Sequence, residues 1–167
     1  MKTKNSKFSD GQKSFFVIAN NIRSLYNVGS IFRTADAFGV SKIFLTGYTG
    51  TPQKPEHAAK IGKVALGAET WVPWEQSATA FAVIRKLKKI YPQIRIIGLE
   101  NNIKAQSLNK YKAAFPLALI LGEEREGIAK SLIKLCDDII EIPMSGKKES
   151  LNVSVAFGIA AYKISNT

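Results

Sequence analysis

Two polar residues that could take part in catalysis, with a glycine between them, lie close together near the start of the sequence. Asn27, Gly29 and Arg33 follow an apolar run and form the pattern N-x-G-x-x-x-R. In a helix, side chains lean toward the N-terminus, so Arg33 would reach back over Gly29, whose bare backbone lets another backbone or a ligand approach. A guanidinium is a planar, permanently charged fork that matches phosphate. Two plainer interpretations stay open, namely Asn27 as the cap of a helix over 28–38 and an ion pair between Arg33 and Asp36.

A second stretch, 119–128, places acids between two glycines directly after an apolar run. Gly122, Glu124 and Gly127 give the pattern G-x-E-x-x-G. The helix dipole stabilises an acid in the first turn of a helix by about 0.3–1 kcal/mol, which accounts for the glutamates as a group. The dipole does not account for a glycine on each side of them. Alone, this pattern is only a weak signal of function.

The third stretch, 139–162, is predicted as a buried strand, a turn broken by proline and glycine, and a nearly all-apolar helix from about Asn152. Such a strand-to-helix loop leaves backbone groups free. Ser150 and Asn152 add small polar side chains at the helix start, while Lys147 and Lys148 add positive charge, which would suit a ligand. Helix capping is the plainer alternative, because Ser and Asn are favoured caps.

Alternating strands and helices must position these three stretches. Strands are expected at 15–20, 42–47, 70–74, 94–99, 116–122 and 139–142. Helices are expected at 28–38, 56–66, 77–90, 126–136 and from about 152 onward. The alternation predicts an α/β fold with a mostly parallel sheet flanked by helices. Ligands of such sheets bind outside the carboxyl ends of the strands, where all three stretches are expected.

Length and charge narrow the class of protein. The 167 residues predict a basic flexible arm over 1–13 and a single domain over 14–167. A formal charge of +11 favours a polyanionic partner, with nucleic acid as the first candidate. No apolar run is long enough to span a membrane and no signal peptide is recognisable, so a cytoplasmic protein without a membrane partner is expected. The only histidine, His57, has no cysteine or second histidine beside it, and no metal site is expected.

Taken together, the three stretches resemble the motifs of the SpoU (TrmH-type) RNA 2′-O-ribose methyltransferases of the SPOUT superfamily. The motifs are N-x-G-x-x-x-R (Asn27, Gly29, Arg33), G-x-E-x-x-G (Gly122, Glu124, Gly127) and I-P-M…S-L-N-V-S (Ile142 to Ser154). The resemblance extends over about residues 14–164. In detail the chain looks most similar to the enzymes that methylate a guanosine ribose in the D-loop of tRNA.

The resemblance implies a cofactor, a knot and an oligomeric state. Family members bind S-adenosylmethionine in a C-terminal deep trefoil knot, need no metal, act on structured RNA such as tRNA or rRNA, and work as homodimers with the site at the subunit boundary. The positions that match the family's cofactor contacts are Leu99, Glu100, Leu121, Gly122, Ile142, Met144, Ser150 and Leu151. Burial of the terminal helix in the dimer interface would suit its apolar residues Val155, Phe157, Ile159 and Tyr162.

The resemblance also assigns roles to the polar residues. Arg33 matches the family's catalytic arginine, but a guanidinium with a pKa above about 12 is a poor base at neutral pH. The hypothesis is therefore that Arg33 grips the phosphate beside the target ribose and polarises the 2′-hydroxyl. Asn27 and Glu124 would hold the arginine and the substrate, and Ser150 and Asn152 would orient the ribose and the cofactor loop. The alternative is a non-catalytic knotted RNA-binding or ribosome-assembly factor.

Overall fold

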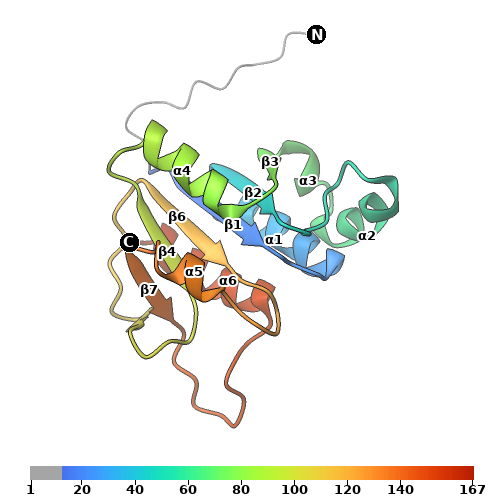
Figure 1. Ribbon diagram of the computed structural model, residues 1–167. Coiled ribbons are helices and arrows are strands. Elements are labelled where there is room, and N and C mark those ends of the chain that lie inside the picture. Colours follow the sequence, from blue (N-terminus) through green and yellow to red (C-terminus); the bar gives the residue numbers. More distant parts are fainter. Residues whose placement is uncertain (1–12) are drawn as a thin grey trace.

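A seven-stranded, fully parallel sheet forms the centre of the computed structural model, which describes residues 13–167 (Figure 1). The strand order is β3-β2-β1-β6-β4-β7-β5. The strands are β1 (Phe15–Asn20), β2 (Lys42–Thr46), β3 (Trp74–Ser77), β4 (Arg95–Leu99), β5 (Gln106–Ser107), β6 (Leu117–Leu121) and β7 (Asp138–Glu141). Val17 of β1 pairs with Ile43 of β2 on one side and with Leu119 of β6 on the other. The predicted α/β architecture is confirmed.

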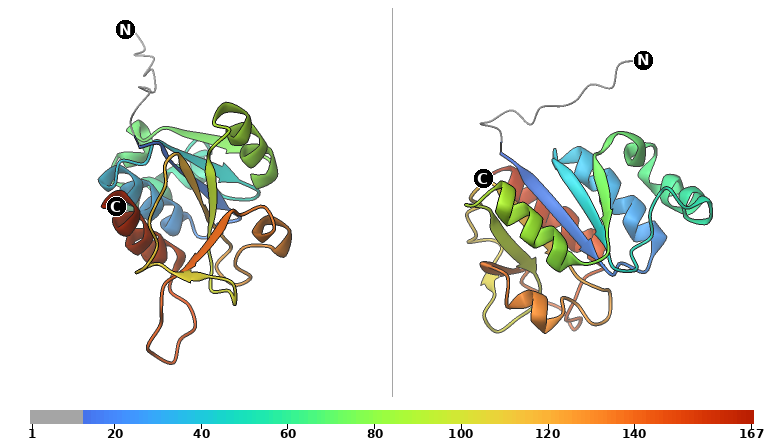
Figure 2. Two further views of the ribbon diagram at one scale, coloured as in Figure 1. Left: turned by 90° about the vertical axis from the view of Figure 1, so that its left-hand side faces the viewer. Right: turned by 45° about the horizontal axis from the view of Figure 1, so that its top comes forward.

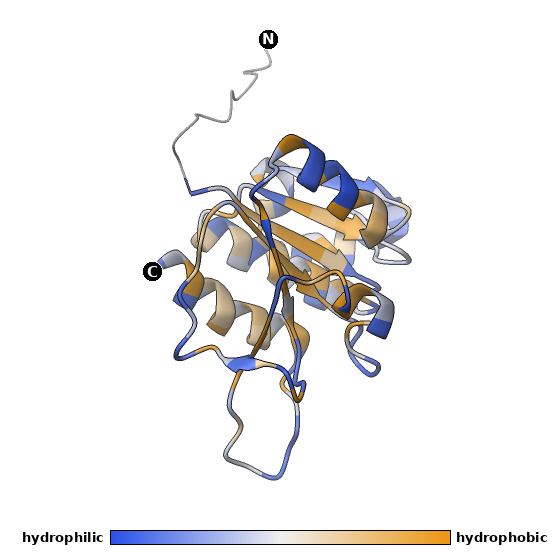
Figure 3. Ribbon diagram, turned by 60° about the vertical axis from the view of Figure 1, so that its left-hand side comes forward, coloured by the Kyte–Doolittle hydropathy of each residue, from blue (hydrophilic) through white to orange (hydrophobic). Residues whose placement is uncertain are grey.

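Helices cover both faces of this sheet (Figure 2). They are α1 (Leu25–Ala37), α2 (Pro55–Ala65), α3 (Ala68–Trp71), α4 (Ala80–Ile90), α5 (Lys130–Ile133) and α6 (Val153–Ser165). Alternate residues of β1 divide the core: Phe15, Val17 and Ala19 pack on the side of α1 and α6. Phe16 and Ile18 pack on the side of α4 and α5. A strand buried on both faces is a continuous apolar run, and Figure 3 shows hydrophobic central strands between the helices.

Gly29 lets α2 pack closely against α1. A Cβ atom at this position would collide with the carbonyl oxygen of Ile61 and lie 3.0 Å from the Cβ of Val64. The glycine of the first motif therefore makes room for the backbone of another helix.

The start of α1 differs from the sequence prediction. Ser24 is the cap residue, since its Oγ accepts the backbone N–H of Asn27 at 3.3 Å, and the helix begins at Leu25. The prediction that Asn27 caps this helix is wrong. Asn27 instead lies in the first turn, which leaves its side chain available for other contacts.

Two other predicted elements are also wrong in part. The strand expected at 70–74 lies later, at β3, because a short helix that starts after Gly67 (φ +97°) occupies Ala68–Trp71. The helix expected at 126–136 is confined to α5. Gly127 has a φ of +67°, which no right-handed helix contains, so the chain turns there before α5 begins. The strand β5 has only two residues, too few to give a periodic signal in the sequence.

The two ends of the described residues, Lys13 and Thr167, lie near each other, and one loop stands apart from the body. Lys13 donates from its Nζ to the backbone oxygen of Thr167 at 2.6 Å. The rest of the arm predicted over 1–13 lies outside the described residues, and the 14–167 domain boundary stays a prediction. The exposed loop 143–150 extends away from the sheet between β7 and α6 (Figure 1). The deep trefoil knot also stays a prediction. Within 13–167, no helix is long and apolar enough to cross a membrane.

Candidate functional site

A cavity of about 200 Å³ opens at the carboxyl ends of β4, β6 and β7. In the sheet β4 lies between β6 and β7, both of which come later in the chain. Loops that are distant in sequence therefore meet at this edge. All of the residues predicted to contact a cofactor line this cavity: Leu99, Glu100, Leu121, Gly122, Ile142, Met144, Ser150 and Leu151.

The cavity wall combines apolar side chains with an excess of carboxylates. Its apolar part includes Leu99, Leu121 and Ile142 from three strand ends, with Leu151 and Val153 from the start of α6. Its charged part contains one arginine, Arg125, and six glutamates: Glu100, Glu123, Glu124, Glu126, Glu141 and Glu149. The cavity is therefore acidic although the whole chain carries a formal charge of +11. Such a wall suits a ligand that carries both apolar surface and positive charge.

The G-x-E-x-x-G motif forms a closed loop on one side of this cavity. Glu123 and Gly127 exchange two backbone hydrogen bonds, at 3.1 and 2.9 Å. A Cβ atom at Gly122 would lie 2.5 Å from the backbone nitrogen of Ile128, and one at Gly127 would collide with the Glu100 carboxylate. That carboxylate accepts the N–H of Ile128 at 2.6 Å and ties the loop to the end of β4. Both glycines are thus required by the closeness of the loop to its own backbone and to Glu100.

One hydrogen-bonded chain joins all three motifs. The Oε1 of Glu124 accepts from the Nδ2 of Asn27 at 3.1 Å. The Oδ1 of Asn27 accepts from the Nδ2 of Asn152 at 3.2 Å. The Oδ1 of Asn152 in turn accepts from the backbone N–H and the hydroxyl of Ser154, at 2.9 and 2.7 Å. The loop after β6 and the starts of α1 and α6 are therefore fixed against one another at the edge of the acidic cavity.

Glu124 holds this arrangement as a carboxylate anion. Burial on its own raises the pKa of Glu124, but hydrogen bonds from the backbone N–H groups of Arg23 and Ser24, each at 3.1 Å, and from the Asn27 amide outweigh it. The net result is a pKa below the ordinary value of 4.5. The anion lies at the N-terminus of α1, where the helix dipole also favours negative charge. Glu124 is therefore a fixed hydrogen-bond acceptor at neutral pH.

Arg33 lies apart from this network. Its side chain is exposed on α1, and it makes no hydrogen bond or ion pair with any of residues 13–167. The alternative ion pair with Asp36 does not form either, and the Oδ1 of Asp36 instead accepts from the Nε1 of Trp71 at 2.8 Å. Within one chain, neither Asn27 nor Glu124 makes a polar contact with Arg33, although both were predicted to position it. Ser150 lines the cavity and is exposed, and no hydrogen bond to it is found in the described part of the chain.

An exposed apolar stripe on α6 lies beside the helix that carries Arg33. Val155, Ile159 and Tyr162 are 51%, 42% and 62% exposed, and α6 packs directly on α1. Phe157, expected with them in an interface, is instead fully buried in the core of its own chain. It projects to the opposite side of the helix from the stripe.

Sequence reasoning missed several residues that position the site. Ser24 caps α1 and donates its N–H to Glu124. Asn101 donates from its Nδ2 to the carbonyl oxygen of Glu149 at 3.3 Å and so tethers the exposed loop 143–150 to the end of β4. A serine three residues before Asn27 is a readable capping signal. Nothing in the local sequence indicates the role of Asn101, whose partner is remote in the chain.

No metal centre is apparent in the part of the chain that the structure describes. Among residues 13–167, no three His, Cys, Asp or Glu side chains are placed together so that they could hold a metal ion.

Comparison with known sequences gives a consistent group of relatives. The model of the SpoU rRNA Methylase family matches residues 14–162. The 23S rRNA (guanosine-2′-O-)-methyltransferase RlmB of Vibrio parahaemolyticus is 31% identical over 147 residues, which are 88% of this chain and 57% of that enzyme. An uncharacterised tRNA/rRNA methyltransferase of Archaeoglobus fulgidus is 30% identical over 154 residues, which are 91% of this chain and 64% of that protein. The chain thus spans less than two thirds of the length of these relatives.

Solved structures give the same grouping. The TrmH/SpoU tRNA modifying enzyme of A. aeolicus matches with a TM-score of 0.80 at 27% identity, over 93% of this chain and 75% of that one. The AdoMet-bound rRNA methyltransferase of Sinorhizobium meliloti also matches with a TM-score of 0.80, at 25% identity, over 91% of this chain and 56% of that one.

Proposed function

Because this chain belongs to the SpoU rRNA methylase family, we propose that it transfers a methyl group from S-adenosylmethionine to a ribose 2′-hydroxyl of RNA. The observation that carries the proposal is the hydrogen-bonded chain from Glu124 through Asn27 to Asn152 at the edge of the acidic cavity. A protein that only binds RNA has no need of three remote motifs fixed beside a carboxylate-rich cavity.

The cavity fits S-adenosylmethionine by charge and by polarity. The cofactor carries a sulfonium, an ammonium and one carboxylate group, so that its net charge is positive, beside an apolar purine face. The wall contains six glutamates beside leucine and isoleucine side chains. When bound, it supplies a methyl carbon that is open to attack by an oxygen nucleophile. The residues that would hold it are those that line the cavity, Leu99, Leu121 and Ile142 among them.

The protein's own residues position the site and orient the substrate. In the transfer the oxygen of the 2′-hydroxyl would bond to the methyl carbon while the carbon–sulfur bond of the cofactor breaks and leaves a neutral thioether, and the hydroxyl proton would pass to water. The hydroxyl must therefore be held and polarised. Glu124 is not placed as the general base, because the N–H groups of Arg23, Ser24 and Asn27 already occupy its oxygens. Its role is to fix Asn27 and the start of α1. Asn152 and Ser150 border the cavity and orient the ribose.

The positive group that contacts the RNA phosphate is Arg33 from a second copy of the chain. Its guanidinium is exposed on α1 beside the apolar stripe of α6, formed by Val155, Ile159 and Tyr162. A two-fold dimer that buries this stripe brings α1 of each protomer toward the other. Arg33 of one protomer then grips the phosphate beside the target ribose in its partner's site and polarises the 2′-hydroxyl.

A mixed dimer tests this arrangement directly. Arg33→Ala and Asn152→Ala are each expected to be nearly inactive as homodimers. A heterodimer of the two variants rebuilds one of its two sites if Arg33 acts across the interface, so each heterodimer should have up to half of the wild-type rate. A 1:1 mixture that exchanges subunits freely should therefore reach up to about a quarter of that rate. If Arg33 acts within its own chain, the heterodimer contains no complete site and the mixture stays inactive. Gel filtration of both variants checks that dimers are present.

The chemistry itself is tested with labelled cofactor. Purified protein is incubated with S-adenosylmethionine labelled in the methyl group and with RNA from a strain that lacks the gene, followed by mapping of 2′-O-methyl sites. We expect one dominant ribose target. The rival, a knotted RNA-binding or ribosome-assembly factor, predicts no label in RNA and no rise in melting temperature with millimolar S-adenosylmethionine, since only a ligand of the folded state stabilises it.

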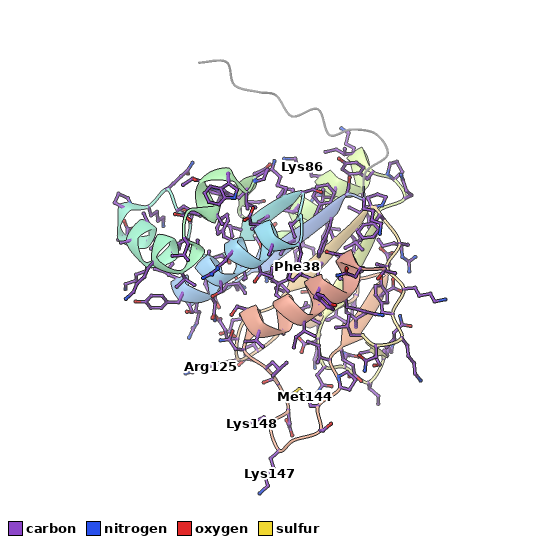
Figure 4. The ribbon with its side chains drawn as sticks, turned by 180° about the vertical axis from the view of Figure 1, so that it is seen from behind. Phe38, Lys86, Arg125, Met144, Lys147 and Lys148 are labelled. Atoms are coloured by element: carbon purple, nitrogen blue, oxygen red, sulfur yellow. The ribbon has the colours of Figure 1, made fainter. Side chains whose placement is uncertain are left out.

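The target is structured RNA, and the same mapping identifies it. A guanosine in the D-loop of tRNA stays the prediction made from the sequence, while the RlmB relatives are named for guanosine in 23S rRNA. A cytoplasmic location stays the prediction made from the sequence. Lys147 points away from the body at the far end of loop 143–150 in Figure 4, and the exposed Lys148 lies beside it. Both are available to contact the phosphates of the RNA.

A further inference from the structure

A second cavity, of about 300 Å³, lies on the other side of the G-x-E-x-x-G loop from the acidic one. We call it the Tyr48 cavity. Its wall combines Tyr48 and Arg23 with the end of β1, Asn20 and Asn21. Four residues line both cavities: Glu123, Arg125, Glu126 and Gly127. A molecule that lies across this loop can therefore occupy both cavities at once.

Tyr48 is presented to the cavity by a rigid and strained turn. Its backbone N–H donates to the Oδ1 of Asn21 at 3.3 Å. Asn21 has a φ of +59°, a conformation that costs a non-glycine residue of order 1 kcal/mol or more. Gly47 has a φ of +65°, and a Cβ atom there would collide with the same Oδ1 atom. The neighbouring Thr49, 3% exposed, accepts the N–H of Ile22 at 3.0 Å and fixes the turn to the end of β1.

Arg23 forms a second wall of the Tyr48 cavity. Its guanidinium lies 5.9 Å from the centre of the Tyr48 ring, and its Nε lies 3.6 Å from the Oε1 of Glu123. The Glu123 side chain is only 9% exposed, whereas that of Arg23 is 63% exposed and Tyr48 is 55% exposed. The ring and the guanidinium therefore do not seal the core. They offer exposed flat surfaces beside a buried carboxylate, a combination on which nucleobases stack.

The position of the cavity matches the covalent structure of a nucleotide. In RNA the base is attached to C1′, which is bonded to the carbon that carries the 2′-hydroxyl. A hydroxyl held at the edge of the acidic cavity thus brings its own base close to the shared 123–127 loop. Asn20 adds hydrogen-bonding capacity, since its Oδ1 accepts from the Thr46 hydroxyl at 2.9 Å while its Nδ2 has no acceptor among residues 13–167.

We propose that the Tyr48 cavity binds the nucleobase of the RNA nucleotide that is methylated, turned out of its stack against Tyr48 and Arg23. The inference rests on the proposed methyl transfer and names the part of the substrate that this second cavity takes. The amide of Asn20 and the carboxylate of Glu126 are available for the edge of the base. A base held in this way fixes the attached ribose beside the cofactor.

The test compares Tyr48 variants on two RNA substrates. The first is an oligonucleotide that spans the mapped methylation site, and the second is the same oligonucleotide with the target base removed and its ribose intact. On the first, Tyr48→Leu should lower kcat/KM by about 5- to 150-fold, the range expected for one lost stacking contact. Tyr48→Phe should keep most of the rate, and Arg23→Gln should lower it by a smaller factor. On the abasic substrate, Tyr48→Leu and wild type should be equally slow.

Controls separate this inference from the proposed function. Phe81→Leu replaces another exposed aromatic residue, at the start of α4, that lines neither cavity, and should leave kcat/KM unchanged. The rise in melting temperature with S-adenosylmethionine should be the same in Tyr48→Leu as in wild type. A Tyr48→Leu penalty that persists in full on the abasic substrate overturns the base assignment, as does a loss equal to that of Phe81→Leu. Failure of wild type to methylate the intact RNA overturns the proposed function instead.

Discussion

Asn27 and Arg33 lie less than two turns apart on α1, yet their surroundings are opposite. Asn27 is held on both sides, by Glu124 and Asn152, at the edge of the acidic cavity. Arg33 is exposed and contacts no polar partner within residues 13–167. Asn27 therefore holds the three motifs of one chain together. Arg33 remains available for a group that this chain does not contain, such as an RNA phosphate.

From this difference we infer that one sequence motif contains two kinds of functional residue. A residue that fixes the site contributes to the stability of the fold as well as to the rate, because its hydrogen bonds exist before any ligand arrives. A residue that acts on the substrate contributes only to the rate. Variants of the two regions should therefore separate stability from catalysis.

The largest effect is expected from Arg33→Ala. Loss of the guanidinium should lower kcat/KM by about 100-fold or more, as for other charge-stabilising donors. The free energy of unfolding should change by less than about 0.5 kcal/mol, because an exposed side chain without partners is removed. Single-turnover methylation and urea unfolding measure the two quantities. Arg33→Lys should not restore the rate, and near-normal turnover by this variant would show that the bidentate grip is wrong.

Gly122→Ala should have the next largest effect, on stability and on cofactor binding together. The added Cβ atom meets backbone atoms of Gly127 and Ile128, which cannot rotate away as a side chain would. We expect a loss of about 1–3 kcal/mol in the free energy of unfolding. The shift of melting temperature with S-adenosylmethionine should shrink as well. Gly146→Ala is the matched control, because a Cβ atom there has no neighbour within 4 Å, and it should change neither quantity.

The contrast between Asn27 and Arg33 also shows what the sequence could and could not predict. The buried strands were readable because β1 and β6 are nearly continuous apolar runs. The cavity was readable because many of its residues directly follow the strands β4, β6 and β7. The cap of α1 was misassigned because Ser24 and Asn27 are both favoured cap residues, and only backbone geometry decides between them.

Other features depended on contacts that no local pattern records. Trp71 and Val72 have high strand propensity, yet Gly67 starts a helical turn just before them. Gly127 delays the start of a predicted helix through its positive φ, and its lack of a Cβ atom allows the approach of Glu100 from β4. The separation of Arg33 from Glu124 depends on which side of α1 faces the loop after β6, and a motif cannot show this. The Tyr48 cavity likewise forms only when β1 and β6 become neighbours.

Glu124→Gln should have a moderate effect that depends on pH. The pKa of Glu124 is lowered in the folded state, so its carboxylate stabilises the fold above the ordinary value of 4.5 and this contribution is lost as the pH falls through the folded-state pKa. At pH 7 the variant should be less stable than wild type by about 1–2 kcal/mol, since the group is partly exposed. The difference should narrow below pH 4.5. Urea unfolding at several pH values measures it, and a difference that is constant with pH would contradict the role of Glu124 as a fixed anion.

The smallest effect is expected from Ser24→Ala. Ser24 caps α1 through the N–H of Asn27, so its loss should destabilise the fold by about 0.5–2 kcal/mol. Thr79→Ala is the matched control, because Thr79 caps α4 in the same way through the N–H of Ala82 at 3.2 Å. The two variants should lose similar stability. Only Ser24→Ala should also lower the methylation rate, by about 10-fold or less, because it loosens the helix end that carries Asn27 but leaves the distant α4 intact. Equal rates in the two variants would mean that Glu124 and Asn152 alone are sufficient to hold Asn27 in place.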